Sequence, residues 1–231
     1  MSEILPGVHA IDGINPSDDF TTNVLLLRDA KGGSWTLLDT GLPASDGYPG
    51  GAAAVERYCA GHHIPLTSIQ RILITHLHLD HTGNLATLAK KTGARIFAHW
   101  LDAAFIAKNP PYTGPGMPPR DAVEVTEKLK DGDEIDAFEG LVAVHTPGHT
   151  PGHVSYFCPA RRILFAGDAV FGEGSGLVVS TPQYTFSSPL ALISLRRLAE
   201  LDVEAVVEYH GTPVLKGGKA KLADAARKAK I

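Results

Sequence analysis

Three histidines and one aspartate lie within residues 76–81, directly after an apolar, β-branched run at residues 71–74. The run predicts a buried strand. Because alternate residues of an extended chain face the same side, we expect His76, His78 and Asp80 to converge. Imidazole nitrogens and a carboxylate held this close indicate a site for a divalent ion, zinc foremost. The alternative is a polar strand end whose histidines bind only the backbone or water.

A helix is expected directly after this cluster. We expect His81 to turn away from the strand where the helix begins, with Asp80 or Thr82 as the N-terminal cap. The apolar spacing at residues 84–92 continues the helical pattern, and Gly93 ends it.

Three further chemistry-bearing side chains follow other predicted strands. His149 lies in the sequence TPGHTPGH, whose prolines and glycines predict a rigid loop. Asp168 follows the apolar run at residues 163–166, and His210 follows the run at residues 205–208. Loops at strand ends collect functional residues from distant parts of a chain. These three residues are therefore candidates to complete the first cluster.

Strand and helix patterns alternate along the whole chain and predict an α/β fold. Strands are expected at residues 23–28, 34–39, 71–74, 95–99, 124–129, 141–144, 153–157, 163–166 and 205–208, and helices at 50–63, 84–92, 190–201 and 216–231. The order is a β-rich half with helices, followed by a second such half. It predicts two sheets packed face to face with helices outside, in a single domain over residues 1–231.

Charge and hydropathy restrict the partners and the compartment. Charged residues make up 20% of the chain and the net charge is −4, so no affinity for nucleic acids or anionic membranes as such is expected. The sequence has no apolar run of transmembrane length, and its start lacks the pattern of a secretory signal. We therefore expect a cytoplasmic protein, unless a leader has been removed. Cys59 and Cys158 are expected to be buried, reduced thiols.

Taken together, these motifs resemble the metallo-β-lactamase fold superfamily of metallo-hydrolases. The superfamily pattern is H-x-H-x-D-H, then a histidine, a Gly-Asp acid and a terminal histidine, and the chain matches it in order from His76 to His210. Asp-Thr-Gly at residues 39–41 and Thr-Pro-Gly-His at residues 146–149 belong to the same likeness. The chain resembles its single-domain glyoxalase II-like and lactonase-like members. The resemblance implies a four-layer αβ/βα sandwich of two mixed sheets with the site at one edge.

The resemblance also implies a binuclear centre with seven ligands. The first ion is held by His76, His78 and His149, the second by Asp80, His81 and His210, and Asp168 bridges both. The two divalent ions are expected to be zinc, with iron or manganese as alternatives. Their bridging hydroxide is the expected nucleophile, and Asp80 is the expected catalytic residue that orients it and passes a proton. The expected reaction is hydrolysis of a small ester, thioester or lactone.

Other functions stay open at this point. Persulfide dioxygenases use the same fold with one iron held by two histidines and an aspartate, and a non-catalytic metal-binding scaffold is a third reading. Classical glyoxalase II proteins carry a long helical C-terminal extension that binds glutathione, whereas only residues 211–231 follow His210. From this we expect that the glutathione-recognition domain is missing. The partner is expected to be a small-molecule substrate, and a homodimer is one option for the assembly.

Four features have two readings each. Asp39 either orients a metal-bound histidine or forms a turn, and His153 either supports a ligand or is structural. Tyr209 replaces the glycine that many relatives have before the terminal histidine, and it either packs sideways or reaches the pocket. The proline-rich loop at residues 107–120 is either a lid over the pocket or a surface connection.

Overall fold

The computed structural model describes residues 2–12, 23–30, 33–45, 48–108, 121–174 and 176–229. These residues form two compact units, Met1–Leu129 and Lys130–Ile231. Each unit contains its own large sheet and its own helices, so the predicted mixed α/β class is confirmed. A single domain over the whole chain stays a prediction. Residues 109–120, which carry most of the expected lid, lie outside the described part of the chain.

The first unit is built on a seven-stranded sheet in which the strands follow chain order. Its strands are β1 (Ser2–Leu5), β2 (Val8–Asp12), β3 (Asn23–Arg28), β4 (Trp35–Leu38), β5 (Ile69–Leu73), β6 (Arg95–His99) and β7 (Glu127–Leu129). The pairs from β1 to β4 are antiparallel, and those from β4 to β7 are parallel. Parallel neighbours need crossover connections, which the helices of this unit supply.

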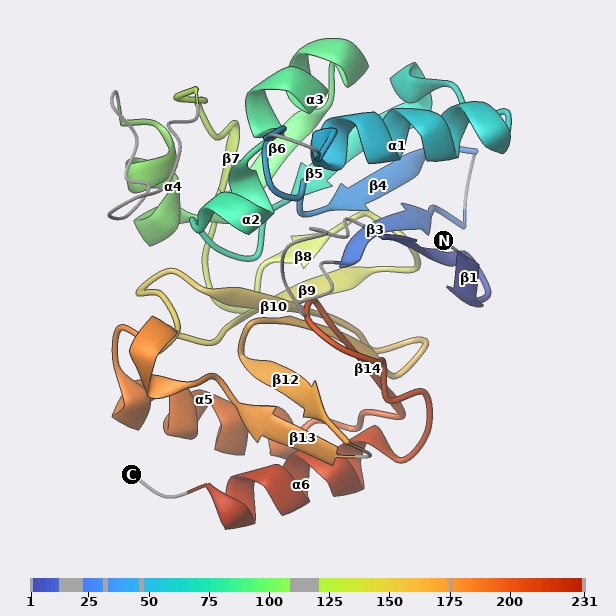
Figure 1. Cartoon of the computed structure of the whole chain (residues 1–231). Coiled ribbons are helices and arrows are strands. Elements are labelled where there is room, and N and C mark those ends of the chain that lie inside the picture. The colour runs from blue at the N-terminus through green and yellow to red at the C-terminus, as the bar shows by residue number, and fades with distance from the viewer. Residues whose placement is uncertain are drawn as a thin grey trace. The chain divides into compact units, whose positions relative to one another are not determined.

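The helices of the first unit are α1 (Gly50–Gly61), α2 (Leu79–Thr82), α3 (Leu85–Thr92) and α4 (Trp100–Ile106), and a short 3₁₀ helix spans Leu66–Ser68. Figure 1 shows α1 and α3 along one face of the sheet, where Val55 and Leu88 join Leu37 and Ile72 in one buried core. Helix α3 ends at Gly93, whose φ of 71° is left-handed, as its sequence predicts. Helix α4 was not expected.

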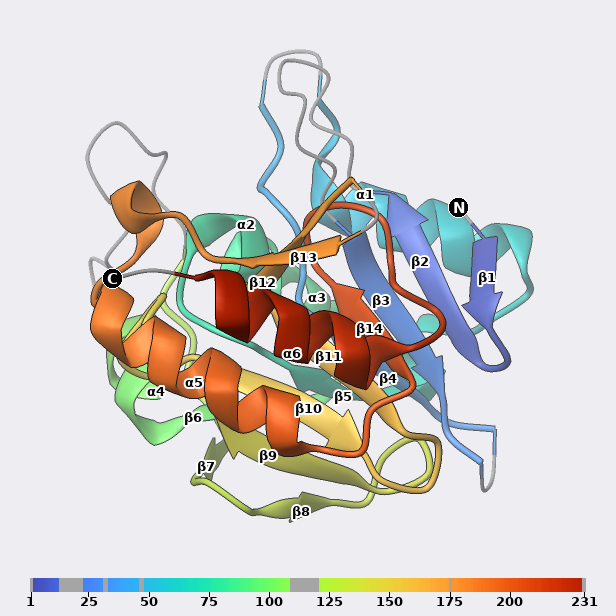
Figure 2. The same ribbon diagram turned by 90° about the horizontal axis from the view of Figure 1, so that it is seen from below.

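The second unit is built on a five-stranded sheet of order β14-β11-β10-β9-β8. Its strands are β8 (Glu134–Ile135), β9 (Leu141–His145), β10 (Val154–Cys158), β11 (Ile163–Gly167) and β14 (Ala205–Glu208), and β12 (Val170–Glu173) pairs with β13 (Gly176–Val179) as a separate hairpin. Figure 2 shows helices α5 (Ser188–Glu200) and α6 (Gly218–Lys228) side by side over this unit's strands. Leu195 and Leu222 from these helices pack with Leu164 and Val206 of β11 and β14.

The cysteines and the membrane-spanning segments were the subject of two further expectations. Cys59 and Cys158 are both buried, and burial raises the pKa of both thiols, that of Cys59 to about 11. Neither thiol therefore has the lowered pKa of a reactive cysteine. Within the described residues, no helix combines the length and the apolar character that crossing a membrane requires.

Candidate metal centre

The four candidate ligands of the first unit converge in two pairs. Nε2 of His76 lies 3.0 Å from Nδ1 of His78, and Nε2 of His81 lies 3.4 Å from Oδ2 of Asp80. His76 and His81 are fully buried, whereas His78 and Asp80 are partly exposed. The predicted clustering of these side chains within the unit is therefore present.

The reason for the convergence differs from the expectation. Strand β5 ends at Leu73, and Asp80 lies in the helical turn α2 rather than on an extended chain. The predicted cap is also wrong, because His78 occupies the N-cap position of α2 without a side-chain capping bond. The Thr82 hydroxyl instead donates to the carbonyl of His78 at 2.9 Å. The orientation of Asp80 and His81 is therefore set by a loop and a helical turn, not by the alternating side-chain directions of a strand.

Asp39 sets the direction of the hydrogen bonds behind these ligands. Its Oδ2 accepts the Thr75 hydroxyl at 2.8 Å and lies 2.8 Å from Nδ1 of His81. An ionised carboxylate only accepts, so the His81 proton must sit on Nδ1. The Thr75 hydroxyl, with its own proton committed to Asp39, can accept from Nδ1 of His76 at 3.1 Å. Both histidines then present Nε2 lone pairs, the form that binds a metal.

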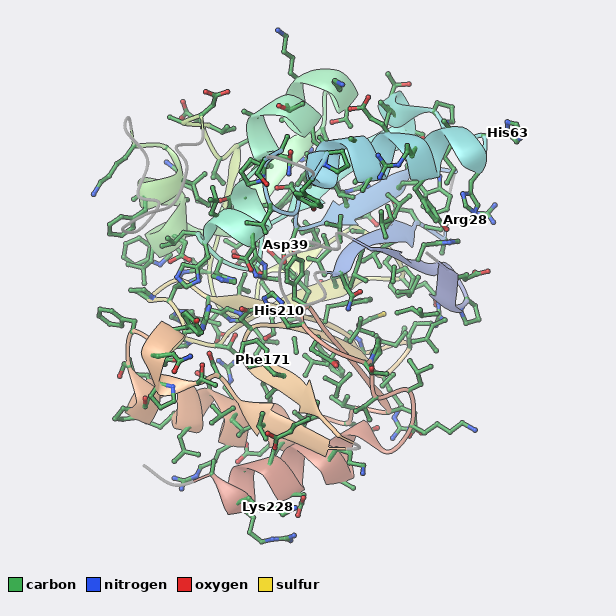
Figure 3. All side chains as sticks on the ribbon, in the orientation of Figure 1. Arg28, Asp39, His63, Phe171, His210 and Lys228 are labelled. Carbon is green, nitrogen blue, oxygen red and sulfur yellow. The ribbon has the colours of Figure 1, made fainter. Side chains whose placement is uncertain are left out.

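Asp39 therefore fits both of its expected readings. It follows β4 with a φ of 59°, so it shapes the turn, and its other oxygen accepts the backbone N–H of Thr75 at 2.8 Å. Its side chain is buried, and Figure 3 labels it. Buried partners of this kind orient metal-ligating histidines and fix their protonation.

The three candidate ligands of the second unit meet at one carboxylate oxygen. Oδ2 of Asp168 lies 3.4 Å from Nε2 of His149 and 3.4 Å from Nε2 of His210. All three side chains are mostly buried. One oxygen thus faces two imidazole nitrogens that come from different loops.

The loop before His149 needs a glycine at position 148 because its backbone lies against helix α5. The φ of Gly148 is 146°, and a Cβ there would lie 2.3 Å from the backbone nitrogen of Ala191 in α5. No side chain fits so close a contact between backbones. The loop is also tied to the segment before α5, because the N–H groups of Phe186 and Ser187 donate to the carbonyls of His149 and Gly148.

His153 supports a ligand rather than serving only as packing. Its Nε2 accepts the backbone N–H of Asp168 at 2.9 Å, so its proton sits on Nδ1, which lies 2.8 Å from the hydroxyl of Thr146. The ring is fully buried. His153 therefore holds the backbone of Asp168, in line with the supporting reading of its role.

Aromatic rings surround the ligands of the second unit. Phe171 of β12 makes edge-on contacts with His149 and His210, with ring centroids 6.5 and 5.6 Å apart, and it lies beside His210 in Figure 3. Tyr209 is buried with its ring 5.0 Å from that of His210, which favours sideways packing. Phe171 has no motif that marks it, so sequence reasoning missed it, as it missed Thr75.

Glu208 is a buried acid beside this group. Its side chain is fully buried, neither oxygen has a hydrogen-bond partner among the described residues, and burial raises its pKa to about 8. A Cβ on Gly172 would lie 2.6 Å from Oε1, so glycine at that position makes room for the carboxyl group.

The spacing of the donors fits a metal ion. Zinc bonds to nitrogen and oxygen of about 2.0–2.2 Å at tetrahedral angles place two ligand atoms roughly 3.3 Å apart. The four ligand pairs within the units are separated by 3.0, 3.4, 3.4 and 3.4 Å. Imidazole and carboxylate donors are those that zinc, iron and manganese accept. The residues present therefore fit divalent ions.

These donor groups are candidate metal ligands on an α/β framework. The family model of the metallo-beta-lactamase superfamily matches residues 17–210 and so spans both units. The chain belongs to the metallo-beta-lactamase superfamily, which its motifs indicate.

Individual relatives agree with this family. A hydroxyacylglutathione hydrolase of Pseudomonas aeruginosa (strain LESB58) is 34% identical over 179 residues, which are 74% of this chain and 57% of that protein. The chain thus matches little more than half the length of that relative. The probable metallo-hydrolase YflN of Bacillus subtilis (strain 168) is 25% identical over 237 residues, and the match covers 90% of this chain and 87% of that protein.

Solved structures agree with the fold. A metallo-beta-lactamase family protein from Thermus thermophilus superposes with a TM-score of 0.72 at 25% identity, covering 97% of this chain and 80% of that one. The subclass B3 metallo-beta-lactamase BJP-1 of Bradyrhizobium japonicum has a TM-score of 0.65 at 20% identity, covering 96% and 89%. The second likeness concerns the fold alone.

Proposed function

We propose that the two ligand groups form one binuclear metal centre and that the protein hydrolyses a small ester, thioester or lactone there. The observation that carries the proposal is the position of Asp168 Oδ2, which lies 3.4 Å from both His149 Nε2 and His210 Nε2. With an oxygen at that distance from both imidazoles, His149 and His210 would each hold one ion, and the charge of Asp168 between them would offset part of the charge of both ions.

The proposed ligands are assigned to two ions. In the proposed centre His76, His78 and His149 would hold the first ion, Asp80, His81 and His210 would hold the second, and Asp168 would be shared by both. The close approach of His76 Nε2 and His78 Nδ1 supports a shared first ion. The approach of His81 Nε2 and Asp80 Oδ2 supports a shared second ion.

When bound, two such ions lower the pKa of a shared water and polarise a carbonyl oxygen of the substrate. Asp80 is proposed to orient the water and to carry a proton to the leaving group. Its side chain is 25% exposed, which leaves it accessible to solvent and substrate. Asp39 keeps the His81 proton on Nδ1. Phe171, partly buried against two ligand rings, offers an apolar wall to the acyl group of a substrate.

The substrate range follows from the relatives and from the site. The Pseudomonas relative is named for hydrolysis of a hydroxyacylglutathione, which supports a thioester among the candidates. No recognition of the glutathione part is proposed. Small acyl compounds with an oxygen or sulfur leaving group are therefore the proposed class.

Metal content and activity, measured on the same preparation, test the proposal. We expect two divalent ions per chain and hydrolysis within a panel of lactones, S-lactoylglutathione, a phosphodiester and a cephalosporin. Asp168→Asn, which keeps the shape of the side chain and removes its charge, should lower both the metal content and the turnover. One iron per chain with oxygen consumption on glutathione persulfide would instead establish the dioxygenase reading.

A further inference from the structure

The proposed ligand His149 has a hydroxyl partner that no motif marks. Nδ1 of His149 lies 2.7 Å from Oγ of Ser180, which is 31 positions further along the chain. Both side chains are buried, with exposed fractions of 4% for His149 and 2% for Ser180. The opposite ring nitrogen, Nε2, faces Asp168. Ser180 therefore lies on the side of the ring away from the proposed metal.

The chemistry of imidazole makes this contact matter. A neutral ring carries one proton, and a metal ion at Nε2 requires that proton on Nδ1. Ser180 Oγ must then accept it. A carbonyl oxygen can only accept, so the one proton of the Thr185 hydroxyl goes to the Thr181 carbonyl at 2.8 Å. Oγ1 of Thr185, which lies 3.0 Å from Ser180 Oγ, then accepts the Ser180 proton. A short hydrogen-bonded group thus holds the oxygen in place beside the ring.

The backbone reinforces this arrangement. Phe186 and Ser187, just beyond Thr185, donate their N–H groups to the carbonyls of His149 and Gly148 at 3.1 and 2.9 Å. One short segment is therefore attached to the His149 loop by two backbone bonds and one side-chain bond. Shifting Ser180 away from the ring would require these bonds to move as well.

We propose that Ser180 is a positioning residue for His149: its buried hydroxyl accepts the Nδ1 proton and directs the Nε2 lone pair to the metal. This inference rests on the proposed metal centre and goes beyond the reaction assigned to it. Ser180 has the role for His149 that Asp39 has for His81, with one difference. A carboxylate only accepts, whereas a hydroxyl can also donate.

Zinc affinity, measured by competition with a chelator, is the first test. Ser180→Ala removes the acceptor without adding bulk, and we expect one of the two ions to bind roughly 10–100-fold more weakly, the usual cost of losing such a partner. Ser194→Ala is the matched control, because Ser194 is also buried and its hydroxyl donates to the Pro147 carbonyl of the same loop. Its zinc affinity should stay within a few fold of the native value.

Ring N–H protons give a second readout that is independent of activity. In the zinc-loaded protein labelled with ¹⁵N-histidine, the Nδ1 proton of His149 should exchange slowly with solvent. In Ser180→Ala it should exchange much faster, while the Nδ1 proton of His81, held by Asp39, stays unchanged as an internal control. Ser180→Thr, which keeps a hydroxyl, should restore the slow exchange.

The outcomes separate the two proposals. Native zinc affinity and slow His149 exchange in Ser180→Ala would overturn the role of Ser180 and leave the metal centre intact. A protein that binds zinc and shows the expected Ser180 effects but hydrolyses nothing would overturn the proposed reaction and leave the role of Ser180 intact.

Discussion

Nδ1 of His81 lies 2.8 Å from Oδ2 of Asp39, and both side chains are fully buried. The two residues are 42 positions apart: Asp39 follows strand β4, and His81 lies in the helical turn α2. Because the carboxylate also accepts the Thr75 hydroxyl, one acid sets the protonation of two candidate ligands. The first unit thus prepares its histidines for a cation through a residue that need not touch that cation.

Asp39→Asn should weaken metal binding while keeping the volume of the side chain. The amide loses the negative charge that stabilises the His81 proton, so we expect roughly 10–100-fold lower affinity for the ion at His81. Asp29→Asn is the control, since Asp29 is also a buried carboxylate of this unit but pairs with Arg71 and Ser34. If both variants bind zinc like the native protein, Asp39 has no orienting role.

Asp80→Ala should reduce turnover by roughly 10²–10⁴-fold if the side chain transfers a proton in the reaction. The measurement is kcat on whichever ester or thioester proves active, with the zinc content determined on the same sample. A fall in kcat that persists at saturating zinc separates catalysis from ligation. Unchanged turnover of every active substrate would rule out a catalytic role for Asp80.

Glu208→Gln should change how stability depends on pH. Below pH 4.5 the carboxyl group is protonated in both the folded and the unfolded chain. Between pH 4.5 and about 8 the unfolded chain ionises while the buried group stays neutral, so the native protein loses stability as pH rises. Glutamine does not titrate, so the variant should lack this loss, which is on the order of a few kcal/mol.

Denaturant unfolding of the metal-free protein at pH 5 and pH 8 checks this prediction. The free energy of unfolding of Glu208→Gln should gain on that of the native chain between the two pH values. An equal difference at both pH values would mean that Glu208 ionises as readily in the folded chain as in the unfolded one.

Much of the framework follows from local patterns. The apolar run Asn23–Arg28 forms β3 and is buried over its first five residues, as continuous hydrophobicity predicts. Helix α4 and the β12–β13 hairpin were not predicted, because both are short: the helix has seven residues and each strand has four. Helix α2 begins earlier than expected, because Leu79 and Asp80 were predicted to be extended and four residues are too few to show a helical period.

The candidate site also contains residues that the sequence predicted and residues that it did not. The candidate ligands were expected because histidine and aspartate at these spacings match a family pattern. Ser180 and Phe171 were not, because a serine after one strand and a phenylalanine within another carry no pattern of their own. Their roles depend on which ring nitrogen each one faces or which ring it contacts, and only the folded chain determines that.

Gly148 gives the His149 loop a mechanical connection to helix α5. A Cβ at Gly148 would lie 2.3 Å from the backbone nitrogen of Ala191, so the loop and the helix meet with no room for a side chain between them. A substitution that displaces the backbone of α5 at Ala191 should therefore also displace the loop that carries His149.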